Sequence, residues 1–167
     1  MTEILKIEYL KKYYIKKKIF ASKSSIVKAV DDVSFSIKKG EVFVLAGESG
    51  SGKSTIAKLI LKSIKADSGK IIFEEQEIDN QKKNLEKIRM NCQMIHQDPY
   101  DSINPRMRVK DIILEPLEIH NIGNKEERDR RVIEVLHEVK LEPAEEIIKK
   151  YPHMLSGGQR QRVVLAR

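Results

Sequence analysis

Tryptophan is absent from this sequence of 167 residues, and aromatic residues as a whole make up only 5% of it. Cys92 is the single cysteine, so the chain cannot form an internal disulfide, and a reducing compartment fits it. No run of about eighteen apolar residues is present, and the lysine-rich N-terminus has no continuous apolar core of a signal peptide. We therefore expect a soluble chain that remains where it is made.

The charge balance is basic, with 32 Lys and Arg residues against 25 Asp and Glu residues and a net charge of +7. Polyanions are therefore candidate partners: nucleotide phosphate, nucleic acid or an anionic membrane surface. Charge alone does not choose among them. The densest cluster, for which a solvated loop is the simplest interpretation, comprises Lys11, Lys12, Lys16, Lys17 and Lys18.

Hydrophobic patterns predict strands first and a helix after them. The stretches Leu5–Tyr9 and Val33–Ile37 alternate apolar and polar residues, which is typical of half-buried strands. The uninterrupted apolar run Val42–Ala46 predicts a strand that is buried on both faces in a parallel sheet. Apolar residues at helical spacing between Ile56 and Ile64 predict a helix after it, closed by the turn residues Asp67, Ser68 and Gly69.

Shorter patterns extend this α/β part and lead into a helical second half. Ile71–Phe73 and Cys92–Ile95 are strand candidates, with a short helix near Leu85–Met90 between them. Beyond them, Val109–Ile119 and Lys125–Lys140 have the apolar periodicity of helices that pack on one broad face. We expect one domain with a helical lobe.

The segment GESGSGKS, Gly47–Ser54, fits the phosphate-loop pattern G-x-x-x-x-G-K-[ST] between a predicted strand and a predicted helix. Glycines at positions 47, 50 and 52 let the backbone adopt positive φ and bring N–H groups close to phosphate oxygens. Lys53 would reach the β and γ phosphates, and the Ser54 hydroxyl would hold Mg²⁺. A chance Gly/Ser-rich turn is the alternative, which the strand and helix context disfavours.

A second glycine-rich element is LSGGQRQR, Leu155–Arg162. Ser156 is a favourable N-cap, and Gly157 and Gly158 leave the N–H groups of the first turn uncovered. This helix start is therefore a second candidate anion site. From the residues alone, an ordinary capped helix start is the commoner interpretation.

The order of these motifs resembles the ABC transporter ATPases, in which LSGGQ is the signature sequence. QMIHQDPYDSINPRMRV, Gln93–Val109, and YPHMLSGGQRQRVVLAR, Tyr151–Arg167, resemble the oligopeptide, dipeptide and nickel importer branch. The likeness covers essentially the whole chain, although His96 stands where that branch usually has an aromatic residue. The resemblance implies an α/β P-loop NTPase core with an antiparallel β subdomain and a helical lobe.

The resemblance also implies roles for individual residues. Gln97 is similar to the glutamine that contacts Mg²⁺ and the water near the γ-phosphate, so that Lys53 and Gln97 are the expected catalytic groups and Ser54 and Gln97 the metal contacts. Tyr13 resembles the aromatic residue that stacks on adenine, and Tyr14 is its close rival. The remaining expected ATP contacts are Gly47, Glu48, Ser49, Gly50, Ser51, Gly52, Lys53, Ser54 and Thr55, with Ser156, Gly158 and Gln159 closing over ATP that a second subunit binds.

The expected organisation is a nucleotide-binding part over residues 1–97, a helical lobe over 98–155 and a signature helix over 156–167. The implied partners are membrane permease subunits, a second ATPase subunit packed head to tail and, indirectly, a solute-binding protein, and no nucleic acid is expected. The implied location is the inner face of the cell membrane.

Such a subunit continues, after its signature helix, into a strand that ends in an Asp-Glu pair, and we expect the core to be incomplete without that part. Neither Ile112–Pro116 nor Ile26–Asp32 is a substitute for the pair, because the first lacks paired acids and the second precedes the phosphate loop. Two other hypotheses stay open: an ATP-binding module that does not hydrolyse ATP, and a soluble ABC-type ATPase that acts on nucleic acid or ribosomes.

Overall fold

The computed structural model describes residues 2–16, 25–79, 81–95 and 102–167. The chain divides into two compact units, Met1–Met94 and Ile95–Arg167, and each has its own hydrophobic core. The domain boundary expected at residue 97 lies outside the described residues. Across those residues, no helix is long and apolar enough to cross a membrane.

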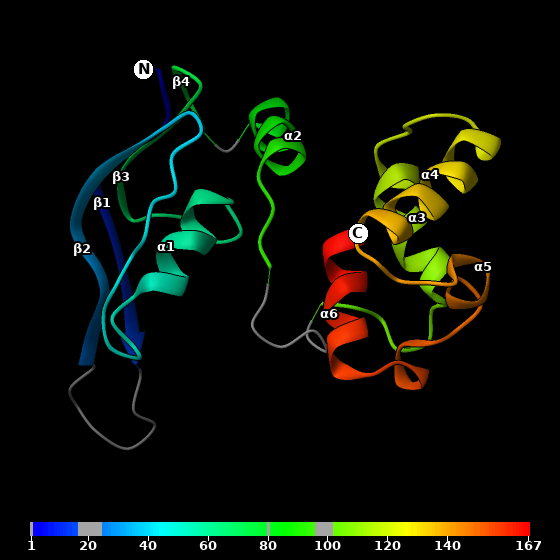
Figure 1. The fold of residues 1–167 in the computed structure, drawn as a ribbon. Helices are drawn as coiled ribbons and strands as arrows, with labels where there is room; N and C mark the ends of the chain where they lie inside the picture. The colour runs from blue at the N-terminus through cyan, green and yellow to red at the C-terminus, as the bar shows by residue number, and fades with distance from the viewer. Residues whose placement is uncertain (1, 17–24, 80, 96–101) are drawn as a thin grey trace. The chain divides into compact units, whose positions relative to one another are not determined.

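The first unit is built on an antiparallel sheet of four strands (Figure 1). β1 (Glu3–Lys16) pairs with β2 (Ser25–Lys38) on one side and with β3 (Ser68–Phe73) on the other, and β4 (Gln76–Glu77) pairs with β3. The strands predicted from alternation are confirmed, and they are longer than their alternating stretches. Irregularities in the β1–β2 register account for the interrupted pattern.

Two helices complete this unit, α1 (Lys53–Ile60) and α2 (Lys82–Asn91). Both predicted helices are therefore present, although α1 ends before Ile64. One face of the sheet and the two helices share a core, which comprises Leu5, Ile7, Leu10, Val30, Ile56, Leu59, Ile71, Phe73, Ile78 and Ile88. Burying such a face is the main stabilising contribution for a small sheet.

Two predicted strands are wrong. Val42–Ala46 and Cys92–Ile95 have no strand pairing, and the side chains of Val42 and Val44 are 90% and 75% exposed. A buried parallel strand needs a hydrogen-bonded partner on each side, and all strand pairs among the described residues are antiparallel. Residues 42–46 are apolar, as a buried strand would be, but no strand among the described residues pairs with them.

The second unit is helical, with α3 (Val109–Ile119), α4 (Lys125–Glu138), α5 (Ala144–Ile147) and α6 (Gly157–Ala166), and a 3₁₀ turn at Pro152–Met154. The two helices predicted here are confirmed. Asn124 caps the start of α4 in a reciprocal pair of hydrogen bonds with Glu127.

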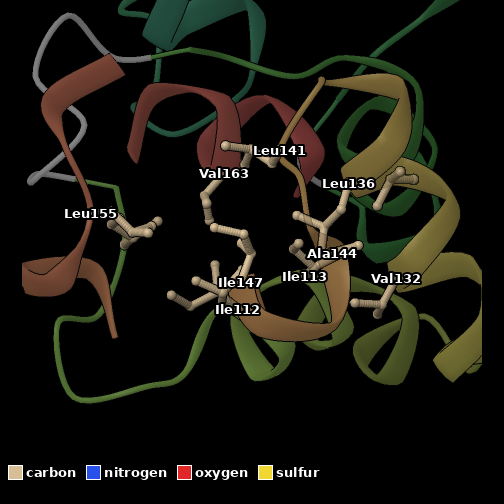
Figure 2. Close-up of a cluster of buried hydrophobic side chains, with 12 residues drawn as sticks. Ile112, Ile113, Val132, Leu136, Leu141, Ala144, Ile147, Leu155 and Val163 are labelled. Carbon is tan, nitrogen blue, oxygen red and sulfur yellow. The ribbon is translucent and has the colours of Figure 1, made fainter. Parts of the chain in front are cut away.

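Figure 2 shows the core of this unit, in which side chains from all four helices and their connections converge. Leu155 and Val163 lie on either side of the start of α6 and are both buried, at 4% and 0% exposure. The glycine-rich start of α6 is therefore held in place by a buried residue before it, Leu155, and a buried residue after it, Val163. The labelled core residues are Ile112, Ile113, Val132, Leu136, Leu141, Ala144, Ile147, Leu155 and Val163.

Candidate functional site

The loop Gly47–Gly52 folds back on itself and packs against β2. The Ser51 amide donates to the Glu48 carbonyl at 3.2 Å. Gly52 has a φ of +93°, and a Cβ at this position would lie 2.1 Å from the Ala29 carbonyl oxygen. Only glycine fits so close to another backbone, so the pattern's glycine at position 52 is explained by this contact.

Lys53 directs its ammonium group into the loop. The Nζ atom donates to the carbonyl oxygens of Gly47 at 2.7 Å and Glu48 at 2.6 Å, and to the Ser51 hydroxyl at 3.1 Å. The three acceptors thus hold the charge at the loop, although the site remains open to solvent. Phosphate oxygens placed there would be charged acceptors and would bind an ammonium more strongly than neutral carbonyls do.

The start of α1 adds backbone donors at the same place. Gly52 is the N-cap, no side chain caps the helix, and the first helical bond runs from the Ile56 amide to the Gly52 carbonyl. The N–H groups of Lys53, Ser54 and Thr55 therefore have no partner within the helix, and the helix dipole places positive charge beside them. Loop, ammonium and helix start together offer the donors and the positive charge that a phosphate group would need, so this is the candidate phosphate site.

The start of α6 is a second open helix end, in the other unit. The Ser156 hydroxyl accepts from the Gln159 amide at 3.2 Å, and the Gln159 side chain accepts from the Ser156 amide at 2.9 Å. This capping box leaves the N–H groups of Gly157 and Gly158 uncapped, and no atom lies within 4 Å of a Cβ built on Gly158.

Ser156 keeps one hydrogen-bonding function in this arrangement. Its oxygen accepts from Gln159, and its hydroxyl hydrogen remains able to donate to a further acceptor. The predicted contacts Ser156, Gly158 and Gln159 therefore lie together on a short helix start, where an anion would meet one hydroxyl and two backbone donors.

Tyr13 and Tyr14 lie on opposite faces of the sheet. Leu10 is fully buried in the core shared with α1. Between Leu10 and Tyr14 the pairing of β1 with β2 is irregular, and the additional residues at each irregularity belong to β2, so that β1 itself keeps its alternation. Alternation along β1 then places Lys12 and Tyr14 on the face of α1, and Lys11 and Tyr13 on the other.

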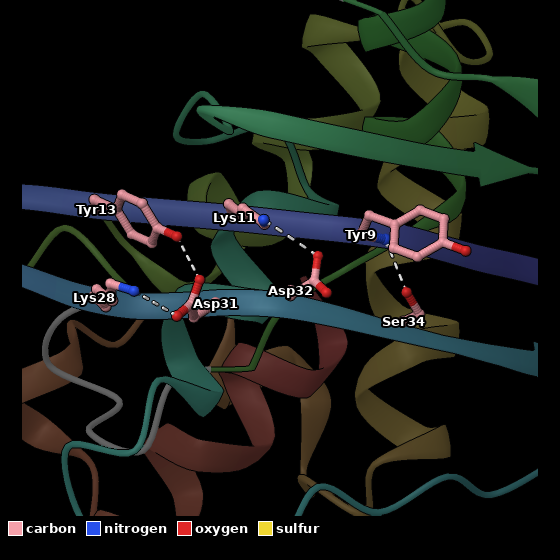
Figure 3. Close-up of polar contacts among 7 residues, drawn as sticks. All are labelled: Tyr9, Lys11, Tyr13, Lys28, Asp31, Asp32 and Ser34. Atoms are coloured by element: carbon pink, nitrogen blue, oxygen red, sulfur yellow. Dashed lines mark hydrogen bonds and ion pairs between the residues drawn. The ribbon is translucent and has the colours of Figure 1, made fainter.

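The Tyr13 side chain is engaged on that outer face, as Figure 3 shows. Its hydroxyl donates to the Asp31 carboxylate, which raises the pKa of Tyr13 and lowers that of Asp31. The Lys28 ammonium lies 2.9 Å from Asp31 and 5.4 Å from the centre of the Tyr13 ring. The alternative residue, Tyr14, is 42% exposed and lies on the face against which α1 packs.

Gln97, predicted as a catalytic group and, with Ser54, as a metal contact, lies outside the described residues. Among the residues that are described, no group of three or more His, Cys, Asp or Glu side chains could hold a metal ion. Sequence reasoning missed the contacts of both tyrosines with charged neighbours. Asp67 was interpreted only as a turn residue, yet it bonds Lys12 and the Tyr13 amide.

A family model described as "ABC transporter" matches residues 30–167. This chain belongs to that family. It is 44% identical to the oligopeptide transport ATP-binding protein AppF of Bacillus subtilis over 98% of its own length and 50% of the relative's. It is 50% identical to the oligopeptide transport ATP-binding protein OppF of Streptococcus mutans over 87% of its length and 47% of the relative's.

Solved ABC structures have the same fold. A dimeric ATP-binding cassette in a post-hydrolysis state, bound to ADP and Pi, matches 97% of this chain and 67% of its own with a TM-score of 0.79 and 30% identity. The cbiO1 component of a Clostridium perfringens ABC transporter matches 99% of this chain and 61% of its own with a TM-score of 0.73 and 28% identity. The predicted fold class, an ABC-type core with an antiparallel sheet and a helical lobe, is confirmed.

The chain spans about half the length of the curated relatives that it matches. The matched half contains the phosphate loop and the LSGGQ segment.

Proposed function

We propose that this chain binds Mg-ATP and is part of an ATPase subunit that drives the import of oligopeptides, dipeptides or a related solute. The observation that carries the proposal is the phosphate loop, in which Lys53 is surrounded by three oxygen acceptors beside the uncapped start of α1. The relatives named as oligopeptide transport ATP-binding proteins support the class of solute.

The loop residues Gly47–Thr55 would contact the phosphates in this proposal. Lys53 would balance the charge of the β and γ phosphates, and Ser54, which is exposed at the start of α1, would contact Mg²⁺. Gln97 is proposed as a further Mg²⁺ and water contact on the resemblance alone. Hydrolysis would then be phosphoryl transfer to water, in which positioning and charge stabilisation dominate.

The start of α6 would complete the site of a second subunit. We assign Ser156, Gly158 and Gln159 to the γ-phosphate of ATP that is held by the phosphate loop of a partner copy or a related chain. Their support is the open helix start and the dimeric form of a similar cassette. Each ATP would be shared between two chains.

As the aromatic residue that stacks on the nucleobase, the geometry favours Tyr14 over Tyr13, the residue that the family resemblance indicates. The Gly52 backbone lies against the Ala29 carbonyl of β2, beside the Val30 side chain, which belongs to the core that β2 shares with α1. Alternation along β1 places Tyr14 on that same face of the sheet. A base joined to phosphates in that loop would meet Tyr14 without crossing the sheet. Tyr13 instead forms its contacts on the outer face with Asp31 and Lys28.

The proposed partners are membrane permease subunits, a second ATPase subunit and, through the permeases, a solute-binding protein. The segment 102–107 and the helical unit would contact the permeases, which would hold the chain at the inner face of the membrane. No nucleic acid is required by this proposal.

A second candidate function is ATP binding without turnover. The exposed segment Val42–Leu45 favours this second candidate. The segment leads into the phosphate loop but is not paired in a sheet, so it does not fix the position of the loop. Calorimetric titration with Mg-ATP, followed by a phosphate-release assay with excess Mg²⁺, separates the candidates. Binding with phosphate release supports the ATPase, binding without release supports the module, and the absence of binding contradicts both.

A further inference from the structure

Lys12 and Asp67 form an ion pair at one side of the Tyr14 ring. The Lys12 Nζ atom lies 2.8 Å from Asp67 Oδ1 and 5.6 Å from the centre of the Tyr14 ring. The second distance is within the range in which an ammonium and an aromatic face attract one another. The Lys12 side chain is only 16% exposed, so its ammonium is held close to the ring rather than free in solvent.

Asp67 also holds the backbone of β1 on either side of Lys12. Its amide donates to the Lys11 carbonyl at 2.9 Å, and its Oδ2 atom accepts from the Tyr13 amide at 2.6 Å. The Lys12 ammonium and then the Tyr13 N–H lower the pKa of the Asp67 carboxyl, which stays ionised at neutral pH. Because Asp67 lies between α1 and β3, it ties β1 to the connection that follows the phosphate-loop helix.

The same strand pair brings Tyr14 near the phosphate loop. The backbone of Gly52 packs on β2 at Ala29. In the register of β1 and β2, Lys12 lies opposite Val30 and Tyr14 opposite Val27. Ala29, which Gly52 contacts, and Val27, which lies opposite Tyr14, are two residues apart on β2, a distance of roughly 7 Å along the strand. The Tyr14 backbone is therefore about that far along the strand from the end of the phosphate loop.

We propose that Lys12 and Asp67 are positioning residues that fix the Tyr14 ring for stacking on the nucleobase of a bound nucleoside triphosphate. This inference rests on the proposed function and extends it to the base. The ammonium lies over one side of the ring, and Tyr14 is 42% exposed, so in this proposal the base stacks on the side away from Lys12. The proposal gives Lys12 and Asp67 contacts with the ring and with the β1 backbone, and none with the phosphates.

The opposite face of the sheet offers a matched control. Tyr13, Lys28 and Asp31 repeat the same chemistry, with the Lys28 ammonium 5.4 Å from the Tyr13 ring centre and 2.9 Å from the Asp31 carboxylate (Figure 3). Substitutions in this second triad remove the same types of group on the face away from α1.

The test is calorimetric titration of the full chain with two probes, Mg-ATP and Mg-tripolyphosphate, of which only the first has a base. Tyr14→Ala should weaken ATP binding roughly tenfold, the usual scale for a lost base–aromatic stack. Lys12→Met and Asp67→Asn should each weaken it roughly three- to tenfold, and Lys12→Arg should restore most of the affinity. Tripolyphosphate affinity should stay within twofold of wild type in all four variants.

The control variants Tyr13→Ala, Lys28→Met and Asp31→Asn should leave both affinities unchanged. The inference is overturned if Lys12→Met and Asp67→Asn leave ATP affinity unchanged, if they weaken both probes equally, or if the control triad carries the effect instead. A wild-type chain that binds neither probe contradicts the proposed function as well. If Asp67→Asn lowers the melting temperature, the comparison of Lys12→Met with Lys12→Arg decides by itself.

Discussion

In the proposed function, Lys53 is the residue on which phosphate binding depends most. Its ammonium is placed by three oxygen acceptors of its own loop, so the charge is already where a β or γ phosphate would lie. Little reorganisation is needed before phosphate oxygens take the place of the carbonyls. This preorganisation is what makes a single lysine effective in phosphate binding.

Cys92 offers a test of the local environment behind the sheet. Burial raises the pKa of its thiol, with a smaller effect from the Glu74 carboxylate, so the thiolate fraction at neutral pH is below that of a free cysteine. We predict slow alkylation by iodoacetamide at pH 7.5 in the native chain and a clear increase in rate in 8 M urea. Equal rates in the native and unfolded chain would contradict this assignment.

At this scale, the sequence defines the candidate phosphate contacts more sharply than the candidate base contact. The spacing of Gly47, Gly52 and Lys53 fixes their roles because one short loop carries them all. The choice between Tyr13 and Tyr14 depends on which of two adjacent residues faces α1. Which of the two tyrosines faces α1 is set by the irregular pairing of β1 and β2, and the alternation of residues in the sequence does not reveal that pairing.

Among the elements, the loop before α1 is the most sensitive to added volume. In Gly52→Ala the new Cβ would lie 2.1 Å from the Ala29 carbonyl oxygen, at a φ of +93° that L-residues avoid. We predict a loss of about 1–3 kcal/mol of local stability, the usual cost of such backbone strain. Hydrogen exchange of α1 and β2 peptides measures it.

Gly158→Ala is the matched control for this prediction. Gly158 lies in the first turn of α6, where no atom is within 4 Å of an added Cβ, so the substitution should leave the stability of α6 unchanged or slightly raised. Equal exchange rates in wild type and Gly52→Ala would show that the loop does not pack on β2 as described.

Two substitutions of Ser156 distinguish its role as a helix cap from its proposed role as a hydroxyl donor to phosphate. Ser156→Ala removes the acceptor for the Gln159 amide and should destabilise the helical unit by about 1 kcal/mol. Ser156→Asn keeps a side-chain acceptor, so stability should return while the hydroxyl donor stays lost. Urea unfolding followed by circular dichroism checks both, and an Asn variant as unstable as the Ala variant would argue against the capping box.

The segment Val42–Leu45 shows how an element can be misjudged from its composition. Its apolar run predicts a buried strand, but burial of that kind depends on neighbouring strands that the local residues do not specify. We predict that its amides exchange within seconds at neutral pH, whereas amides near Leu10 and Val30 are protected. Slow exchange across residues 42–45 would mean that the segment is hydrogen-bonded.

For the whole molecule, family membership was predictable because the order of the two glycine-rich motifs is specific to ABC ATPases. The helices Val109–Ile119 and Lys125–Glu138 were predictable from periodicity, since each packs one apolar face on the core of the second unit. The presence of β1 and β2 was predictable from alternation, but their full length was not, because the register of the pair is irregular and breaks the alternation. The geometry of the proposed shared site would depend on a second chain and is beyond what a single sequence predicts.

Titration of the chain with Mg-ATP, in wild type and Lys53→Met, tests the central claim most directly. Loss of a charged hydrogen-bond donor to phosphate costs about 1.5–3 kcal/mol, so affinity should fall roughly ten- to a hundredfold. Lys58→Met, which removes an exposed lysine from the last turn of the same helix, should leave affinity within about twofold, because that charge lies outside the loop. Equal affinity of wild type and Lys53→Met, or no binding by wild type, would contradict the account.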